Sequence, residues 1–232
     1  MSLFTISDLH LPLGVNKPMN IFGSGWDNYV ERLMKNWQSI ITPEDTVVLP
    51  GDFSWAMYLD EAVADFEFLH SLNGTKILLK GNHDYWWETK GKMNKFLSEK
   101  GFSDIKILHN DFYISENTAI CGNRGWTYPP VSEEDKKLYE RELQRLELSI
   151  QKAYSQIPDN IIVFTHYPPI SPLFPNTPFV DILKKYNIKK CFYGHLHGAS
   201  LSHATEGIID GIEYRLVSSD YRKFVPYKIT NF

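Results

Sequence analysis

The chain has 232 residues, of which 43% are hydrophobic and 22% are charged, and its formal net charge is -4 at pH 7. This composition excludes a disordered polar chain and is typical of a globular protein with a sizeable core, so we expect a single domain over residues 1–232. The negative net charge gives no support for binding to nucleic acid or to an anionic membrane, and neither partner is favoured.

The chain begins with a predicted strand at 3–6 that is followed by Asp8 and His10. Because these polar residues interrupt the apolar stretch and no basic region precedes it, we expect no signal peptide and no membrane span. A loop rich in proline and glycine, 12–25, is expected to form one wall of a cleft. Apolar residues at helical spacing then predict a helix over 26–41, with its aromatic side chains in the core.

The next strand, at 46–49, runs into Gly51-Asp52, and a helix over 62–72 leads to a third strand at 77–79. That strand ends in Gly81-Asn82-His83-Asp84, which places an amide, an imidazole and a carboxylate in consecutive positions. Continuous apolar runs of this kind are typical of strands that are buried on both faces of a sheet. Ligands of open α/β sheets bind beyond the carboxyl ends of such strands.

A helix is predicted from Tyr85 to Lys100, and Gly101 is expected to end it. Short strands are then predicted at 105–108, 112–115 and 118–122. Arg124 lies just after the last of these strands, where a guanidinium group suits contact with a substrate oxyanion. A structural or solvent-facing arginine fits the sequence equally well.

Ser132 and Asp135 have the spacing of a capping box and predict a charged helix over 133–154. A buried strand at 161–164 follows and leads to His166. The proline-rich segment beyond His166 is expected to form a stiff rim.

A helix at 180–186 precedes the last strand of the predicted site, at 191–193, which is followed by His195 and His197. Asp210-Gly211 stands between two apolar runs and predicts a hairpin with a type I′ turn, which extends a sheet.

The two cysteines, Cys121 and Cys191, lie in separate apolar runs without CxxC spacing. We therefore expect buried thiols in a reducing compartment, and a cytoplasmic location.

Five predicted strands thus deliver Asp, Asn or His at their carboxyl ends, which indicates one edge where these side chains converge. Mixed carboxylate, imidazole and amide ligands suit Mn, Fe, Zn or Co better than calcium. The set exceeds the needs of one ion, but two ions sharing a carboxylate would use it fully, generate a hydroxide and clamp a phosphate. No GxSxG, GxxxxGK or GxGxxG motif offers another chemistry. The candidate ligands are Asp8, His10, Asp52, Asn82, His166, His195 and His197, with His83 and Asp84 beside them.

The ordered motifs resemble the signature of the calcineurin-like metallophosphoesterase superfamily. They are Asp8-x-His10, Gly51-Asp52, Gly81-Asn82-His83-Asp84, His166 and Gly194-His195-x-His197. The match spans residues 8–197. The resemblance implies an α/β fold, a four-layer α-β-β-α sandwich of two mixed sheets, with the metal site at the carboxyl ends of the strands.

The resemblance also implies roles for the site residues. One divalent ion, with Mn, Fe or Zn favoured, would be held by Asp8, His10 and His197. The second ion would be held by Asn82, His166 and His195. Asp52 would bridge the two ions, and a metal-bridging hydroxide would attack phosphorus in line. His83 would donate a proton to the leaving group or stabilise the transition state, and Asp84 would orient the His83 imidazole.

Protein phosphatases of this superfamily carry GDxVDRG and RGNHE, whereas this chain has Gly51-Asp52-Phe53-Ser54-Trp55 and Lys80-Gly81-Asn82-His83-Asp84. The difference favours a small bacterial-type phosphohydrolase that acts on a phosphomonoester or a phosphodiester. Two alternatives stay open: a nuclease or nucleotide phosphodiesterase, and a non-catalytic metal-binding scaffold for a protein partner. Aromatic residues including Trp55, Trp86 and Trp126 offer a stacking wall for a nucleobase, although packing explains them as well.

Overall fold

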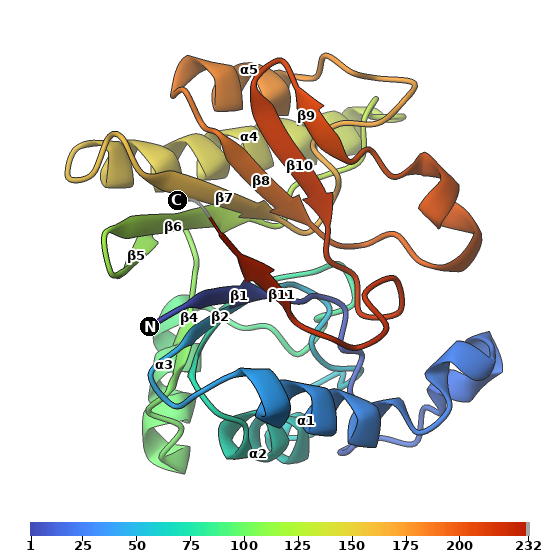
Figure 1. The fold of residues 1–232 in the computed structure, drawn as a ribbon. Coiled ribbons are helices and arrows are strands. Elements are labelled where there is room, and N and C mark those ends of the chain that lie inside the picture. The colour runs from blue at the N-terminus through green and yellow to red at the C-terminus, as the bar shows by residue number, and fades with distance from the viewer. Residues whose placement is uncertain (231–232) are drawn as a thin grey trace.

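The structure, a computed structural model that describes residues 1–230, stacks two β-sheets face to face between two layers of helices (Figure 1). The first sheet has the order β11-β1-β2-β3-β4, and only the pairing of β11 with β1 is antiparallel. Its strands are β1 (Leu3–Thr5), β2 (Thr46–Pro50), β3 (Thr75–Leu79), β4 (Ile105–Ile107) and β11 (Tyr227–Ile229).

The second sheet has the order β5-β6-β7-β8-β10-β9, with parallel central pairs and antiparallel pairs at both edges. Its strands are β5 (Phe112–Ser115), β6 (Thr118–Asn123), β7 (Ile161–Thr165), β8 (Lys190–Tyr193), β9 (Gly207–Ile209) and β10 (Ile212–Leu216). Both sheets are mixed, so the expected α-β-β-α sandwich is confirmed.

Helices cover the outer face of each sheet (Figure 1). The first sheet carries α1 (Tyr29–Ile40), α2 (Val63–Ser71) and α3 (Lys90–Lys100), and the second carries α4 (Glu133–Tyr154) and α5 (Pro178–Lys185). Short 3-10 segments are η1 (Met19–Phe22), η2 (Ser24–Trp26) and η3 (Gly198–His203). Within residues 1–230, no helix combines the length and the apolar character needed to cross a membrane.

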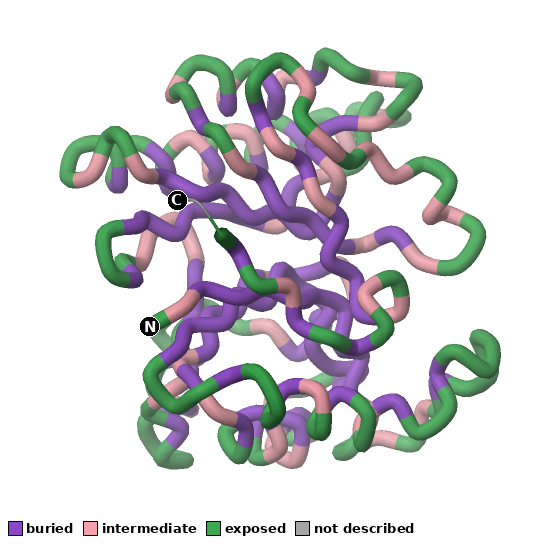
Figure 2. The backbone as a smooth tube through the Cα atoms, in the orientation of Figure 1, coloured by how far each residue is buried: buried purple, intermediate pink, exposed green. Residues whose placement is uncertain are grey.

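Three apolar layers hold the sandwich together, because each sheet is buried on both of its faces (Figure 2). Between the sheets, Val48 and Ile77 belong to the same buried cluster as Phe164 and Phe192. This burial explains why the strands are continuous apolar runs without a polar face. Cys121 and Cys191 are free, buried thiols, as expected.

Several local expectations are confirmed. The Asp135 N–H donates to the Ser132 hydroxyl over 3.1 Å at the start of α4. The turn at Asp210-Gly211 has positive φ at both residues, 51° and 79°, as a type I′ hairpin requires.

The predicted helix start at Tyr85 is wrong, because α3 begins only at Lys90, after the cap residue Thr89. The reason is a tertiary contact: the indole of Trp86 donates to Asp84 over 3.1 Å, and its ring packs edge-on against Phe66 in the core.

Two other predictions differ from the structure. Trp26 lies in η2, outside α1. The strand β11 has no counterpart in the predicted elements, since three residues at a sheet edge carry too little pattern.

The two sheets are joined beyond β1 and β10. The Ser7 N–H donates to Val217 O over 2.9 Å, and the Ser219 N–H donates to Ser7 O over 3.0 Å. This short connection, named here the seam, holds the carboxyl ends of the two sheets together. It places the segment that carries Asp8 beside the segment that carries His195, whose N–H lies 3.1 Å from Asp8 Oδ1.

Asp65, on α2, is a buried carboxyl group that accepts hydrogen bonds from the Leu13 N–H and the Ser54 hydroxyl. Burial raises the pKa of Asp65 to about 7, although these two hydrogen bonds oppose the shift. The same group ionises at lower pH in the unfolded chain, so the free energy of unfolding should fall as the pH rises from about 4 to about 7. Asp65→Asn should remove roughly 2–3 kcal/mol of that fall, measured by urea unfolding at about pH 5 and about pH 8. Equal pH dependence in the variant and the wild type would contradict this account; the exposed Asp60→Asn is the control.

Candidate metal centre

The structure brings all the predicted ligands to one place, where the carboxyl ends of the parallel strands meet. Four of them have left-handed backbone conformations: φ is 58° at Asp8, 46° at His10, 53° at Asp52 and 75° at His195. Such values are uncommon outside glycine and cost free energy, and they concentrate at functional sites. These four residues follow strands, and their side chains lie close to one another.

Two groups of side chains have the spacing of metal ligands. In the first, ligand atoms of Asp8, His10 and His197 lie within 4.8 Å of one another, and in the second those of Asp8, Asp52 and His166 do so. Asp52 Oδ2 lies 3.8 Å from His10 Nε2 and 3.5 Å from His166 Nε2. Asp52 thus stands between the two ligand sets, as a bridging carboxylate requires, while Asp8 also belongs to both groups.

Asn82 joins the second group through its side-chain oxygen. This Oδ1 atom lies 2.6 Å from His166 Nε2 and 2.8 Å from His195 Nδ1. The two imidazole nitrogens are themselves 3.3 Å apart. An amide oxygen and two ring nitrogens that converge in this way form the donor set expected for the second ion.

His197 completes the first group. Its Nδ1 lies 2.8 Å from Asp220 Oδ1, and its Nε2 lies 3.1 Å from Asp8 Oδ1. That Nε2 atom is buried and has no hydrogen-bond partner among the described residues. A carboxylate on the far nitrogen of a histidine commonly fixes the ring of a metal ligand. Asp220 was not among the predicted residues.

The protonation of the site also suits metal binding. Burial lowers the pKa of His166 to about 3 and that of His195 to about 4, so both rings are neutral at pH 7 and keep a lone pair for a metal. Burial raises the pKa of Asp52 well above its ordinary value, and the charges of Asp84 and Asp8 add to the effect. A bound cation would relieve this crowding of carboxylates, so the residues present fit divalent ions.

At Asp8 and His197 the shifts run the other way. Burial alone would raise the pKa of Asp8, but the charges of His197, His166 and His10 outweigh it and hold the pKa well below its usual range. Burial alone would lower the pKa of His197, yet Asp8 and Asp220 raise it to about 10. Without ions His197 therefore holds a proton beside the ionised Asp8, and a metal ion would take the place of that proton.

Glycines allow the loops to approach this closely. A Cβ atom at Gly51, whose φ is 91°, would lie 2.6 Å from Gly81 Cα and 2.7 Å from His166 Nδ1. A Cβ atom at Gly194 would overlap Asp8 and Ser7. Both positions therefore require glycine if the ligands are to meet.

A profile of the family described as calcineurin-like phosphoesterase matches residues 1–199. The chain belongs to this calcineurin-like phosphoesterase family. The family and the grouped Asp and His side chains together indicate a metal-dependent phosphoesterase.

Solved structures share the fold at low sequence identity. The chain is similar to a protein of unknown function, AQ665, from Aquifex aeolicus, with a TM-score of 0.52 and 18% identity over 98% of this chain and 95% of that one. A second solved structure has a TM-score of 0.58 and 12% identity over 92% of this chain and 88% of that one. Both likenesses bear on the fold alone. The comparison with curated proteins found no match.

In this phosphoesterase, His83 lies next to the ligands but outside both ligand groups. Its ring centroid is 5.7 Å from that of His10 and 4.7 Å from that of Trp55. The Lys17 ammonium lies 3.1 Å from the centroid of Trp55. Burial lowers the pKa of His83, and the charge of Lys17 lowers it further. His83 is half-buried and lines a hollow beside the candidate ligands.

The hydrogen bonds of Asp84 go to groups other than the His83 imidazole, so the orienting role that the resemblance implies stays a prediction. Asp84 is fully buried, and among the described residues no hydrogen bond joins it to the His83 imidazole. Its carboxylate instead accepts from the backbone N–H groups of Asp52, Phe53, Ser54 and Gly81, over 2.9, 2.9, 3.4 and 2.7 Å, and from the Trp86 indole. Asp84 therefore ties the loop after β2 to the loop after β3.

Arg124 is engaged with residues other than the candidate ligands. Its Nη2 lies 3.6 Å from Oε1 of the buried Glu142, and its guanidinium carbon lies 4.3 Å from the ring centroid of Trp126. These contacts favour the structural reading of Arg124, and its contact with substrate stays a prediction. Of the aromatic residues considered as a stacking wall, Trp55 borders the ligands, whereas Trp86 is buried in the core.

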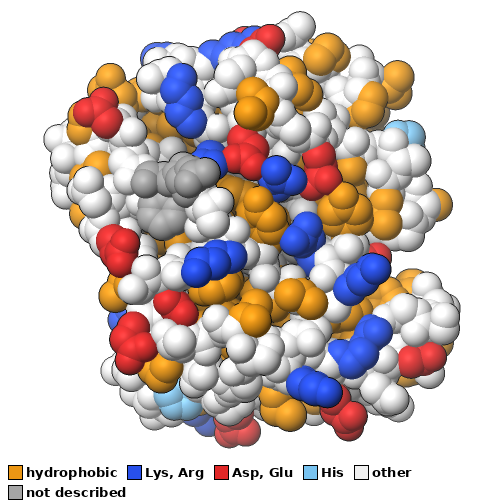
Figure 3. Space-filling view, viewed as in Figure 1, with side chains coloured by type: hydrophobic (Ala, Val, Ile, Leu, Met, Phe, Trp, Pro, Cys, Tyr) orange, Lys and Arg blue, Asp and Glu red, His pale blue; other side chains and the backbone are white. Residues whose placement is uncertain are grey.

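A hollow of about 300 Å³, named here the apolar hollow, opens beside His10, His83 and His197. The segments η1 and η2 on one side and η3 on the other project toward it, and the surface is indented between them (Figures 1 and 3). The Pro/Gly-rich loop that carries η1 and η2 thus forms the expected wall of a cleft.

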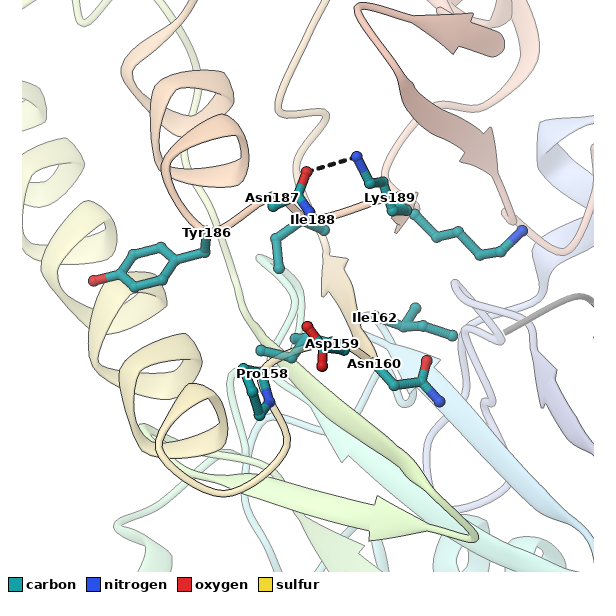
Figure 4. A pocket seen from close by; sticks show the side chains of 10 residues that line it. Pro158, Asp159, Asn160, Ile162, Tyr186, Asn187, Ile188 and Lys189 are labelled. Carbon is teal, nitrogen blue, oxygen red and sulfur yellow. Dashed lines mark hydrogen bonds between the residues drawn. The ribbon is translucent and has the colours of Figure 1, made fainter.

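A different hollow lies at the opposite ends of β7 and β8 (Figure 4). It is lined by the segments 158–162 and 186–190, and in it the Lys189 ammonium donates to Asn187 Oδ1 over 2.6 Å. It lies at the amino-terminal ends of the strands, whereas the candidate ligands follow their carboxyl ends.

Proposed function

We propose that the protein hydrolyses a small phosphomonoester or phosphodiester at a centre of two divalent ions, with Mn, Fe or Zn favoured. The observation that carries the proposal is the position of Asp52 between His10 and His166, at the junction of the two ligand sets. Bound ions would supply the hydroxide nucleophile and neutralise charge on the phosphate.

Each residue of the site would then have a distinct role. The first set, Asp8, His10 and His197, and the second set, Asn82, His166 and His195, hold the centre. His83 donates a proton to the leaving oxygen; because its pKa is lowered, the ring is mainly neutral at pH 7 and the protonated form is the minor one. Asp84 fixes the positions of Asp52 and His83 relative to each other, because it accepts hydrogen bonds from the loop after β2 and from the loop after β3.

The test is hydrolysis of p-nitrophenyl phosphate and bis-p-nitrophenyl phosphate by metal-stripped protein reconstituted with Mn. We expect metal-dependent turnover, and His83→Ala should lower kcat by about a hundredfold without changing the number of ions bound. His70→Ala, on α2 and away from the ligands, is the control and should keep full activity. Failure on both esters, with two ions bound, would contradict the proposal.

Two further measurements, turnover of oligonucleotides and copurification of a partner, separate the alternatives. A nuclease would turn over single-stranded oligonucleotides faster than small diesters, but the net charge of -4 does not favour it. A scaffold would bind two ions without hydrolysis and would copurify with a stoichiometric protein partner. A cytoplasmic location remains part of the proposal.

A further inference from the structure

The apolar hollow adjoins the residue that faces the leaving group. His83 lines the hollow together with His10 and His197, so the hollow is continuous with the candidate metal centre. In the function proposed above, on which this inference rests, His83 protonates the leaving oxygen. The substituent carried by that oxygen must extend away from the ions. The hollow that His83 lines is the space next to this oxygen.

The walls of this space are mainly apolar and aromatic. Met19, Phe22, Trp26 and Trp55 line it, and among the described residues its lining contains no lysine or arginine. Its carboxylate, Asp220, is already paired with His197. An anionic or polyhydroxylated substituent would find few partners here, whereas a flat apolar group would lose its contact with water on several sides.

The aromatic side chains that line the hollow differ in how much of each ring is exposed. One face of Trp55 stacks on His10, with ring centroids 4.5 Å apart, and the Lys17 ammonium also lies over the ring. Trp26 is 6% exposed and packs against Tyr29 and Phe224. Phe22, by contrast, is 59% exposed. An exposed phenyl ring beside a preformed apolar hollow is the surface on which a second ring can pack.

We propose that the substrate is a phosphoester whose leaving group carries a planar, uncharged aromatic ring, and that Phe22 is a specificity-determining residue for that ring. The ring would occupy the apolar hollow, with Phe22 on its outer side and Met19 and Trp26 on its inner side. The volume of about 300 Å³ lies at the lower end of the range for small-molecule pockets, which suits one ring system rather than a polymer.

The experiment compares benzyl phosphate with ethyl phosphate, two esters whose alcohols have similar acidity, on the Mn-loaded full chain. We expect kcat/KM to be roughly tenfold or more higher for benzyl phosphate, because the ring is buried in the complex. Phe22→Ser should reduce that preference about fivefold, through a lower kcat/KM for benzyl phosphate. As a readout without catalysis, calorimetry should show tighter binding of benzylphosphonate than of ethylphosphonate to the wild type, with the difference reduced in Phe22→Ser.

Ile21→Ser is the matched control, because Ile21 is 69% exposed on the same turn and does not line the hollow. It should keep the wild-type preference. Equal turnover of the two esters, or an unchanged preference in Phe22→Ser, would overturn the inference while leaving the proposed function intact. No turnover of either ester by protein with two ions bound would overturn the proposed function and this inference with it.

Discussion

Asp52→Asn should lower metal-dependent phosphoester hydrolysis by about a thousandfold and reduce the number of tightly bound ions from two to one. Asp52 Oδ2 stands 3.8 Å from His10 Nε2 and 3.5 Å from His166 Nε2, so the substitution removes charge at the point that both ligand sets share. The amide keeps the size of the side chain. Steady-state kinetics and metal analysis of dialysed protein measure the two effects.

The stability of the metal-free protein separates loss of function from loss of fold. The pKa of Asp52 is raised by burial and by the charges of Asp84 and Asp8, so its ionised form is unfavourable in the folded protein without ions. The metal-free Asp52→Asn variant should therefore be at least as resistant to heat as the metal-free wild type at pH 7. Wild-type activity in this variant would show that Asp52 is not a ligand of the centre. Asp60→Asn, at an exposed position, serves as the control.

Asp84→Ala should destabilise the fold by about 3–5 kcal/mol, because the carboxylate is the buried acceptor for four backbone N–H groups and one indole. In a chain of this size the melting temperature should fall by roughly 10 °C, and activity should be lost in the folded fraction. Differential scanning calorimetry of the metal-free protein measures the effect without involving catalysis.

A graded comparison tests whether Asp84 acts on the loops. Trp86→Phe removes the indole donor but keeps the carboxylate and the four backbone hydrogen bonds, so it should cost much less stability than Asp84→Ala. If Asp84 instead acted on the His83 imidazole, Asp84→Ala would lower activity and leave the melting temperature unchanged. That result would restore the role implied by the family resemblance.

The sequence alone located the candidate site, because each strand that enters it is a buried apolar run with polar residues directly after it. The positions of Asp8, Asp52 and His166 follow from this pattern, since parallel strands bring their carboxyl ends to one edge. The pairing of the sheets came from the family resemblance. No local pattern shows that the segment after β1 meets the segment after β10.

What escaped prediction depends on contacts between distant parts of the chain. Asp220 follows no apolar run that ends in a motif, and only the fold places it 2.8 Å from His197 Nδ1. The segment after Asp84 has helical composition. However, the Trp86 indole donates a hydrogen bond to Asp84, and α3 begins only at Lys90. Local propensity lost to tertiary packing at this position.

The seam has a consequence for the order of events during synthesis. It joins residues 212 positions apart, Ser7 and Ser219, and the neighbouring contact between Asp8 and His195 spans 187 positions. Contacts of such large sequence separation form late, because they close the longest loops of the chain. During synthesis Asp8 and His10 are therefore made well before His195, His197 and Asp220, the residues that lie beside them in the folded protein. The candidate ligands can come together only after this later segment has been made.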